Sequence, residues 1–172
     1  GYHSLVFAGL GAQVLAFEPN RHNVQRLQAH LERNPALARN IRHLAVAVSD
    51  RDGEMEFVQS GDMLGQSSGS HLAAALPPLG PAVYAQCERV VVPVARMDSL
   101  IERGERPPHI IKLDVEGAEL LALEGGRKLL ADQKPLLLVE VHHICLMCHL
   151  QQLLWPLGYT VRILDEEHAA PS

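Results

Sequence analysis

The stretch that decides the fold is IIKLDVEGAE, residues 110–119. Its first four residues form a largely apolar run of strand length that stops at Asp114 and Glu116, and a helical segment follows from about Gly117 to Ala131. In open parallel sheets, ligands bind at the carboxyl ends of the strands, and Asp114 and Glu116 would lie at that end of this strand. The stretch therefore predicts an α/β fold and the edge of the sheet at which a site would lie.

The same alternation continues toward the amino terminus. Val14 to Phe17 predicts a buried strand, and the helix that follows is capped by Asn20 and stopped by Asn34-Pro35. Ile41 to Val48 predicts the next strand, which Ser49-Asp50 closes. Because strands and helices alternate, we expect a mostly parallel sheet with helices on both faces.

The remaining elements follow from the same patterns. We expect Gly61 to Gly80, rich in Gly, Ser, Ala and Pro, to form a long loop over the sheet. The other predictions are an edge strand from Glu54 to Val58, an extended run from Arg89 to Val94, a strand from Leu136 to Val141, a helix near Leu146 to Leu154, and a final strand from Tyr159 to Leu164.

Composition limits the classes of protein to consider. With 172 residues, 47% of them hydrophobic, residues 1–172 predict a single domain. A net charge of -5 without a block of basic residues makes nucleic acid an unsuitable partner, and no apolar run reaches the roughly 20 residues of a membrane-spanning helix. Three cysteines, an odd number, favour a reducing, cytoplasmic location over a disulfide framework.

Acidic residues follow three of the predicted strands, and one lies near the end of a fourth. They are Glu18, Asp50, the pair Asp114 and Glu116, and Glu140. A carboxylate at Glu18 can accept hydrogen bonds from both hydroxyls of a ribose, which points to a cofactor that contains adenosine. Nicotinamide-binding folds use the same contact, and a solvated turn residue would look alike, so the pattern alone leaves these alternatives open.

Four short motifs, in order along the chain, carry a family resemblance. They are Phe17-Glu18-Pro19-Asn20, Ala47-Val48-Ser49-Asp50, Met97-Asp98-Ser99-Leu100 and the octapeptide from Lys112 to Glu119. Together they resemble the FkbM family of methyltransferases that depend on S-adenosylmethionine (SAM), from Gly1 to about Tyr159. The resemblance implies a Rossmann-like class I methyltransferase fold and methyl transfer, usually to oxygen on a sugar, polyketide or other small molecule.

The resemblance also assigns cofactor residues. It implies that Glu18, with Asn20 in the same motif, binds the cofactor ribose and that the turn from Val48 to Asp50 borders the adenine. Asp114 and Glu116 would lie beside the methionine end of SAM and the acceptor. Of the family's glycine loop only the last glycine, Gly1, is matched.

The chain therefore resembles an incomplete methyltransferase domain. The first, central strand of the family fold would lie between the strand ending at Glu18 and the strand ending at Asp114, and it has no counterpart here. Buried backbone groups without partners cost about 1 to 3 kcal/mol each. We therefore expect these 172 residues alone to bind SAM poorly.

A hydroxyl acceptor must lose a proton, which requires a general base. His142 and His143 follow the strand that ends at Val141, so one of them is a candidate base, and Glu116 is the competing one. Asp114 and Glu116 could instead hold the positive methionine moiety, or a divalent ion together with His142, although no metal is predicted. Glu119 is expected to favour the dipole at the start of its helix.

A second cluster consists of Cys145, Cys148 and His149. Their spacing matches covalent haem attachment and half of a zinc site. The only other cysteine is Cys87, and leucines at helical spacing place the segment on an amphipathic helix, so neither site is predicted.

The sequence as a whole predicts a SAM-dependent methyltransferase that acts on the oxygen of a small molecule or sugar. Two alternatives remain: a nicotinamide-dependent oxidoreductase, and an inactive fragment or binding module with the same fold. Ser67, Ser68, Ser70 and His71 offer polar contacts for an acceptor without identifying it. The oligomeric state is not predicted.

Overall fold

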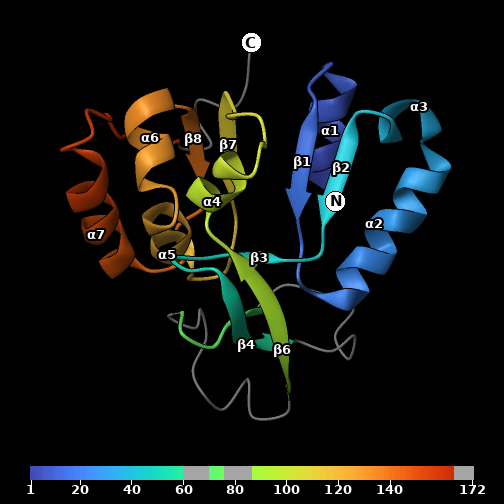
Figure 1. Cartoon of the computed structure of the whole chain (residues 1–172), viewed down its shortest axis with the longest axis horizontal. Helices are drawn as coiled ribbons and strands as arrows, with labels where there is room; N and C mark the ends of the chain where they lie inside the picture. Colours follow the sequence, from blue (N-terminus) through green and yellow to red (C-terminus); the bar gives the residue numbers. More distant parts are fainter. Residues whose placement is uncertain (60–69, 76–86, 165–172) are drawn as a thin grey trace.

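A computed structural model of the chain describes residues 1–59, 70–75 and 87–164. Strands and helices alternate along most of it (Figure 1). In order they are α1 (Tyr2–Gly9), β1 (Val14–Phe17), α2 (Arg21–Arg33), α3 (Pro35–Ala38), β2 (Ile41–Leu44), β3 (Ala47–Val48), β4 (Gly53–Gln59), β5 (His71–Leu72), β6 (Glu88–Ala95), α4 (Met97–Glu102), β7 (Ile110–Leu113), α5 (Glu119–Glu124), α6 (Arg127–Gln133), β8 (Leu136–Val139) and α7 (Ile144–Leu154).

The strands form three separate sheets among the described residues. β1 pairs with β2 and β7 pairs with β8, both in parallel, and the third sheet has the order β3-β6-β4-β5. In this third sheet β3 is parallel to β6, whereas β4 is antiparallel to both of its neighbours. The prediction of an α/β fold is confirmed, but the expected single, mostly parallel sheet is divided into two parallel pairs and one mixed sheet.

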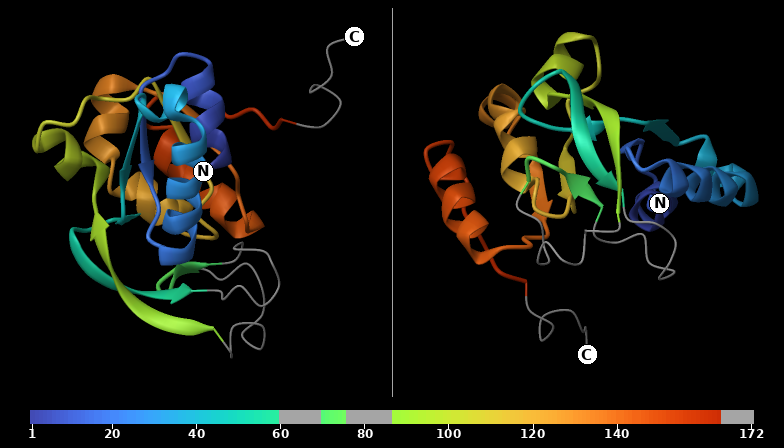
Figure 2. Two further views of the ribbon diagram at one scale, coloured as in Figure 1. Left: turned by 90° about the vertical axis from the view of Figure 1, so that its right-hand side faces the viewer. Right: turned by 90° about the horizontal axis from the view of Figure 1, so that it is seen from below.

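Helices cover the two parallel pairs (Figures 1 and 2). α1, α2 and α3 lie beside β1 and β2, and α5, α6 and α7 lie beside β7 and β8. The main hydrophobic core joins β7 to the latter helices through buried leucines such as Leu113, Leu123, Leu130 and Leu150. A second core is formed mainly by residues of the mixed sheet, such as Phe57, together with Ala118.

Local sequence signals place the first elements as predicted. The Asn20 side chain accepts a hydrogen bond from the backbone N–H of His22 at 2.9 Å and caps α2. α2 ends at Arg33, and Pro35 begins α3, where its missing N–H costs nothing. Gly11, with φ of 89°, follows α1 in the left-handed conformation that glycine adopts readily.

Three predicted elements are wrong or divided. The strand from Ile41 to Val48 is two strands, because β2 pairs with β1 whereas β3 turns to pair with β6. The helix from Gly117 to Ala131 is interrupted by Gly125-Gly126, which separates α5 from α6. Tyr159 to Leu164 forms no strand.

The strand around Glu54 to Val58 is not an edge strand. It is part of β4, which pairs with β6 along its length and with the short β5 at Phe57 and Val58. β5 lies inside the stretch predicted as a loop, of which the structure describes residues 70–75. The short pairing with β5 covers the far edge of β4.

β1 and β7 each pair along one edge only within the described ranges. No described strand lies between them, so neither has a hydrogen-bonding neighbour on its second edge. That a first central strand belongs at this position stays a prediction.

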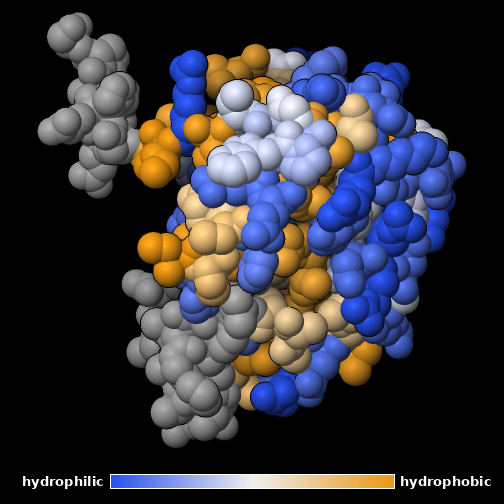
Figure 3. Space-filling model, turned by 90° about the vertical axis from the view of Figure 1, so that its left-hand side faces the viewer, coloured by the Kyte–Doolittle hydropathy of each residue, from blue (hydrophilic) through white to orange (hydrophobic). Residues whose placement is uncertain are grey.

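The outer side of α7 is partly hydrophobic. Ile144 and Trp155 are 91% and 61% exposed, while Leu146 and Leu150 of the same helix segment are buried. The space-filling view of this side of the molecule shows hydrophobic residues interspersed among hydrophilic ones (Figure 3). Within the part of the chain that the structure describes, every helix is too short or too polar to cross a lipid bilayer.

Candidate functional site

Residues that follow β1 and β7 line one cleft of about 320 Å³. Glu18 comes from the end of β1, and Asp114 and Glu116 come from the end of β7. Val48 of β3 also lines the cleft, which is within the size range of small-molecule sites, about 300 to 1,000 Å³. Acidic side chains from two separate sheets thus meet at one cavity.

Glu18 is held by the beginning of α2. Its Oε1 accepts a hydrogen bond from the backbone N–H of Asn20 at 2.9 Å, and its Oε2 accepts one from the amide of Asn23 at 3.1 Å. A carboxylate oxygen has two lone pairs, so each oxygen can accept one further bond. Burial raises the pKa of Glu18, although the hydrogen bonds from Asn20 and Asn23 oppose this shift.

Asn20 is fully buried and does not line the cleft. Besides capping α2, it donates a hydrogen bond from its amide nitrogen to the hydroxyl of Ser70 at 3.0 Å. It therefore connects the start of α2 to the segment that leads into β5. Gly1 also does not line the cleft.

The two ends of the turn from Val48 to Asp50 lie in different surroundings. Val48 is buried and lines the cleft, whereas Asp50 does not line it. Both oxygens of Asp50 accept hydrogen bonds from Arg51, at 2.9 Å each. The hydrogen bond from Arg51 lowers the pKa of Asp50.

Asp114 and Glu116 occupy a turn in which the backbone is strained. Glu116 has φ of 50° and Gly117 has φ of 93°. A positive φ at a residue other than glycine costs about 1 to 3 kcal/mol, and such strain clusters at functional sites. The turn keeps both carboxylates at the cleft, since both residues line it.

His142 joins the acidic cluster from the segment that follows β8. Its Nε2 lies 3.5 Å from Oε2 of Glu116, 3.8 Å from Oδ1 of Asp114 and 3.9 Å from Oε1 of Glu140. Its Nδ1 lies 2.7 Å from Oε1 of Glu119. His143, the other candidate base, is the residue that immediately precedes α7.

The charged neighbours of His142 determine its ionisation. Desolvation lowers the pKa of His142, but the hydrogen bond to Glu119 and the charges of Glu116, Glu119 and Asp114 outweigh it. The net pKa is raised above the ordinary value of a histidine. His142 is therefore a group that takes up a proton readily.

Glu119 is the residue that sequence reasoning misjudged. It was expected only to favour the helix dipole, yet its side chain is 0% exposed and contacts His142. Ala122 and Leu123 are also fully buried, and their spacing of three and four from Glu119 places all three on the inner face of α5. That spacing was the available signal.

The mixed sheet supplies the opposite wall of the cleft. Phe57 of β4, Ser70, and His71 and Leu72 of β5 line it, and His71 is only 4% exposed. β5 was not predicted, because its pairing with β4 depends on residues far apart in the sequence. Ser67 and Ser68 lie outside the described residues.

One group of side chains has the spacing of a metal site. Ligand atoms of Asp114, Glu140 and His142 lie within 4.8 Å of one another. The ammonium of Lys112 already lies 3.4 Å from Asp114 and 3.7 Å from Glu140, so the cluster contains its own cation. Cys145 and Cys148 are exposed on α7 and form no such group among the described side chains.

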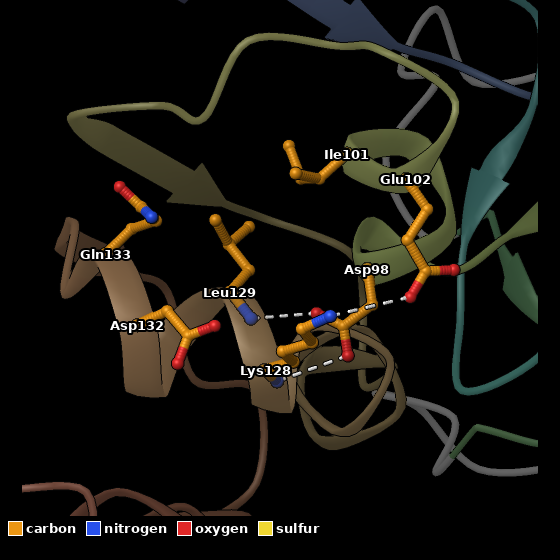
Figure 4. A pocket seen from close by; sticks show the side chains of 7 residues that line it. All are labelled: Asp98, Ile101, Glu102, Lys128, Leu129, Asp132 and Gln133. Carbon is orange, nitrogen blue, oxygen red and sulfur yellow. Dashed lines mark hydrogen bonds and ion pairs between the residues drawn. The ribbon is translucent and has the colours of Figure 1, made fainter.

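A smaller hollow of about 50 Å³ lies between α4 and α6 (Figure 4). Asp98 accepts hydrogen bonds there from the backbone N–H groups of Leu129, at 2.9 Å, and Lys128, at 3.2 Å. The hollow has the size of a site for a few water molecules, far smaller than the cleft. Asp98 thus caps the start of α6.

Comparison with known proteins gives three matches. Residues 2–159 match the model of the methyltransferase FkbM domain. The chain is 30% identical over 132 residues to the hexuronic acid methyltransferase AglP of Haloferax volcanii, an alignment that covers 76% of this chain and 48% of that protein. The chain thus spans about half the length of this curated relative.

The third match is structural. The crystal structure of the methyltransferase FkbM from Methylobacillus flagellatus superposes with a TM-score of 0.53 at 22% identity, covering 82% of this chain and 30% of that one. At this identity the likeness concerns the fold alone.

Proposed function

The chain belongs to the FkbM family of methyltransferases, and we propose that its cleft binds SAM and serves methyl transfer to a hydroxyl of a small molecule or sugar. The observation that carries the proposal is that Glu18, after β1, and Asp114 and Glu116, after β7, line one cleft. Family membership favours methyl transfer over the hydride transfer of a nicotinamide enzyme.

The cofactor fits the charge and hydrogen-bonding groups of the cleft. None of its described lining residues is Lys or Arg, and three of them are acidic, which suits the positive charge of a sulfonium. When bound, SAM supplies a methyl group on that positively charged sulfur. Glu18 has one spare acceptor position on each oxygen for the two ribose hydroxyls, and Val48 offers an apolar surface for the adenine.

We place the reacting hydroxyl near Asp114 and Glu116. Nε2 of His142 lies within 4 Å of both carboxylates, which makes it the preferred general base for that hydroxyl, with Glu116 as the competing base. The negative charges of Asp114 and Glu116 would also lie beside the positively charged sulfonium of SAM. The main task of these residues is to align the hydroxyl oxygen with the methyl carbon and to remove its proton.

The acceptor class is supported by the curated relative. That relative, of which this chain spans about half, is named for hexuronic acid. We therefore propose a sugar or related polyhydroxyl compound as the first class to assay. Ser70 and His71 on the opposite wall are the polar groups placed to contact it.

The direct test is transfer of tritium from methyl-labelled SAM to neutral sugars and hexuronates by the intact protein. We expect transfer, and we expect His142→Ala to lower it by about 10²- to 10⁴-fold, the contribution of a positioned base. His149→Ala, an exposed histidine of α7, is the matched control.

Two outcomes would contradict the proposal. Normal turnover of both His142→Ala and His143→Ala would eliminate a histidine base. Absence of transfer to any hydroxyl acceptor would favour a non-catalytic module with the same fold.

A further inference from the structure

The carboxylate of Glu119 is buried in a way that does not stabilise the fold. Its side chain is 0% exposed, at the first position of α5. Oε1 accepts a hydrogen bond from the backbone N–H of Gly117 at 3.2 Å and lies 2.7 Å from Nδ1 of His142. Oε2 is buried and has no hydrogen-bond partner among the described residues.

A carboxyl group with an unsatisfied oxygen is costly in the interior of a protein. Leaving a buried polar atom without a partner costs about 1 to 3 kcal/mol, and apolar residues of similar size often replace buried ionic groups without loss of stability. Its neighbours on the inner face of α5, Ala122 and Leu123, are apolar. The carboxylate therefore needs an explanation in what it does to its partner, and the closest partner is the His142 ring.

We infer that Glu119 is a positioning residue, which acts through His142 and never touches the substrate. A carboxylate can only accept hydrogen bonds, so in the neutral ring of His142 the facing Nδ1 carries the proton and Nε2 has the lone pair. That lone pair is directed toward Asp114 and Glu116, where the acceptor hydroxyl is proposed to lie. The inference rests on the proposed function for its catalytic consequence, but not for the state of the ring.

The proton moves along one defined path. The O–H bond of the acceptor breaks, its proton forms a bond with Nε2, and the electron pair stays on the acceptor oxygen. The imidazolium that results is stabilised by Glu119 through the Nδ1–H bond that was already present. No proton needs to pass to Glu119.

Other charges act on the same ring. Asp114, Glu116 and Glu140 face Nε2, and Lys112 contacts Asp114 and Glu140 from their other oxygens. The pKa of His142 is raised, against its desolvation, first by the hydrogen bond to Glu119 and then by the charges of Glu116, Glu119 and Asp114. Glu119 differs from the others because it alone engages Nδ1.

The test is an NMR titration of the imidazole nitrogens of His142 in the intact protein and in Glu119→Gln. The amide of Gln retains an acceptor for Nδ1–H but removes the charge. We expect the pKa of His142 to fall by about one unit or more, the effect of losing an opposite charge within 4 to 6 Å. Glu124→Gln, a partly exposed acid at the other end of α5, is the matched control and should leave the pKa unchanged.

A second variant separates charge from geometry. Glu119→Asp keeps the charge but shortens the side chain, so the carboxylate no longer reaches Nδ1 and the ring should lose its preference for the Nδ1–H tautomer. This variant also keeps the inference testable if Glu119→Gln does not fold. An unchanged pKa and tautomer of His142 in Glu119→Gln, or an unchanged tautomer in Glu119→Asp, would overturn the inference.

Activity gives an independent readout. With SAM and a working acceptor, Glu119→Gln should lower kcat by about 10-fold or more and shift the acid limb of the pH profile to lower pH, with little change in KM for SAM. If the pKa of His142 falls in Glu119→Gln but the protein transfers no methyl group, the positioning role stands and the proposed function is rejected. An unchanged pKa of His142 in Glu119→Gln, in a protein that does transfer methyl groups, would reject the positioning role and leave the proposed function standing.

Discussion

Gly125 shows how a single residue places one wall of the cleft. A Cβ atom added to Gly125 would lie 1.9 Å from the carbonyl oxygen of Ser49 and 2.9 Å from its carbonyl carbon. Only glycine allows the end of α5 to approach the backbone that follows β3 so closely. This contact fixes Ser49, which is fully buried, and with it the adjacent Val48 of the cleft.

We therefore expect Gly125→Ala to lower the free energy of unfolding by about 1 to 3 kcal/mol or more, since the backbone of Ser49 has to move. The measurement is urea unfolding followed by circular dichroism. Gly9→Ala is the matched control, because nothing lies within 4 Å of its added Cβ and alanine is the better helix former. Equal stability of the two variants would contradict this role for Gly125.

At the scale of elements, Asp98 connects α4 to α6. It is 5% exposed and its carboxylate accepts the N–H groups of Lys128 and Leu129, which have no partner within α6. Arg96 lies 3.2 Å from the same carboxylate. The side chain thus satisfies the first turn of a helix that contributes Leu129 and Leu130 to the main core.

Asp98→Ala should destabilise the protein by about 1 to 3 kcal/mol, because it removes a cap and leaves two N–H groups unsatisfied. Asp132→Ala, an exposed acid of the same helix, should change stability by less than about 0.5 kcal/mol. Chemical unfolding of both variants provides the comparison. A loss no larger in Asp98→Ala than in Asp132→Ala would show that the cap does not stabilise α6.

Elements whose limits depend on local signals could be predicted from the sequence. Asn20 and Pro35 set the two ends of α2 through the backbone groups next to them, and β1 has the predicted bounds. The division of the strand from Ile41 to Val48 could not be predicted, because β2 and β3 pair with strands from different parts of the chain. The break between α5 and α6 falls at the two consecutive glycines Gly125-Gly126, whose low helix propensity is a local signal.

The same distinction applies to the candidate site. The acids after β1 and β7 were predicted because they stop apolar runs, and the structure places Glu18, Asp114 and Glu116 on one cleft. Asn20, which the resemblance assigns to the cofactor, caps α2 and donates a hydrogen bond to Ser70, and its cofactor role stays a prediction. The spacing of Glu119 from Ala122 and Leu123 indicates its burial, but its contact with His142, 23 positions away, is not visible in any local pattern.

At the scale of the whole molecule, residues from all three sheets, which differ in how well they are packed, form the cleft. Glu18 comes from the β1–β2 pair, Asp114 and Glu116 follow β7, and the mixed sheet closes the opposite wall, while His142 reaches the cleft only through its contacts with these two acids. The main core lies around β7 and β8, whereas the only buried residues before Ile41 are Ala8, Asn20 and Leu27 within the described ranges. The position of Glu18 relative to Asp114 is therefore the central structural claim of the proposed SAM site.

Calorimetric titration of SAM into the full-length protein, as distinct from residues 1–172 alone, and into its Glu18→Ala variant tests that claim most directly. We expect SAM to bind and Glu18→Ala to weaken the binding by about 10- to 100-fold, as expected for losing charged hydrogen bonds worth about 1.5 to 3 kcal/mol. Glu54→Ala, an exposed acid of β4, should bind as the unmodified protein does. Equal affinity of Glu18→Ala and the unmodified protein, or binding of NADH in place of SAM, would contradict the account.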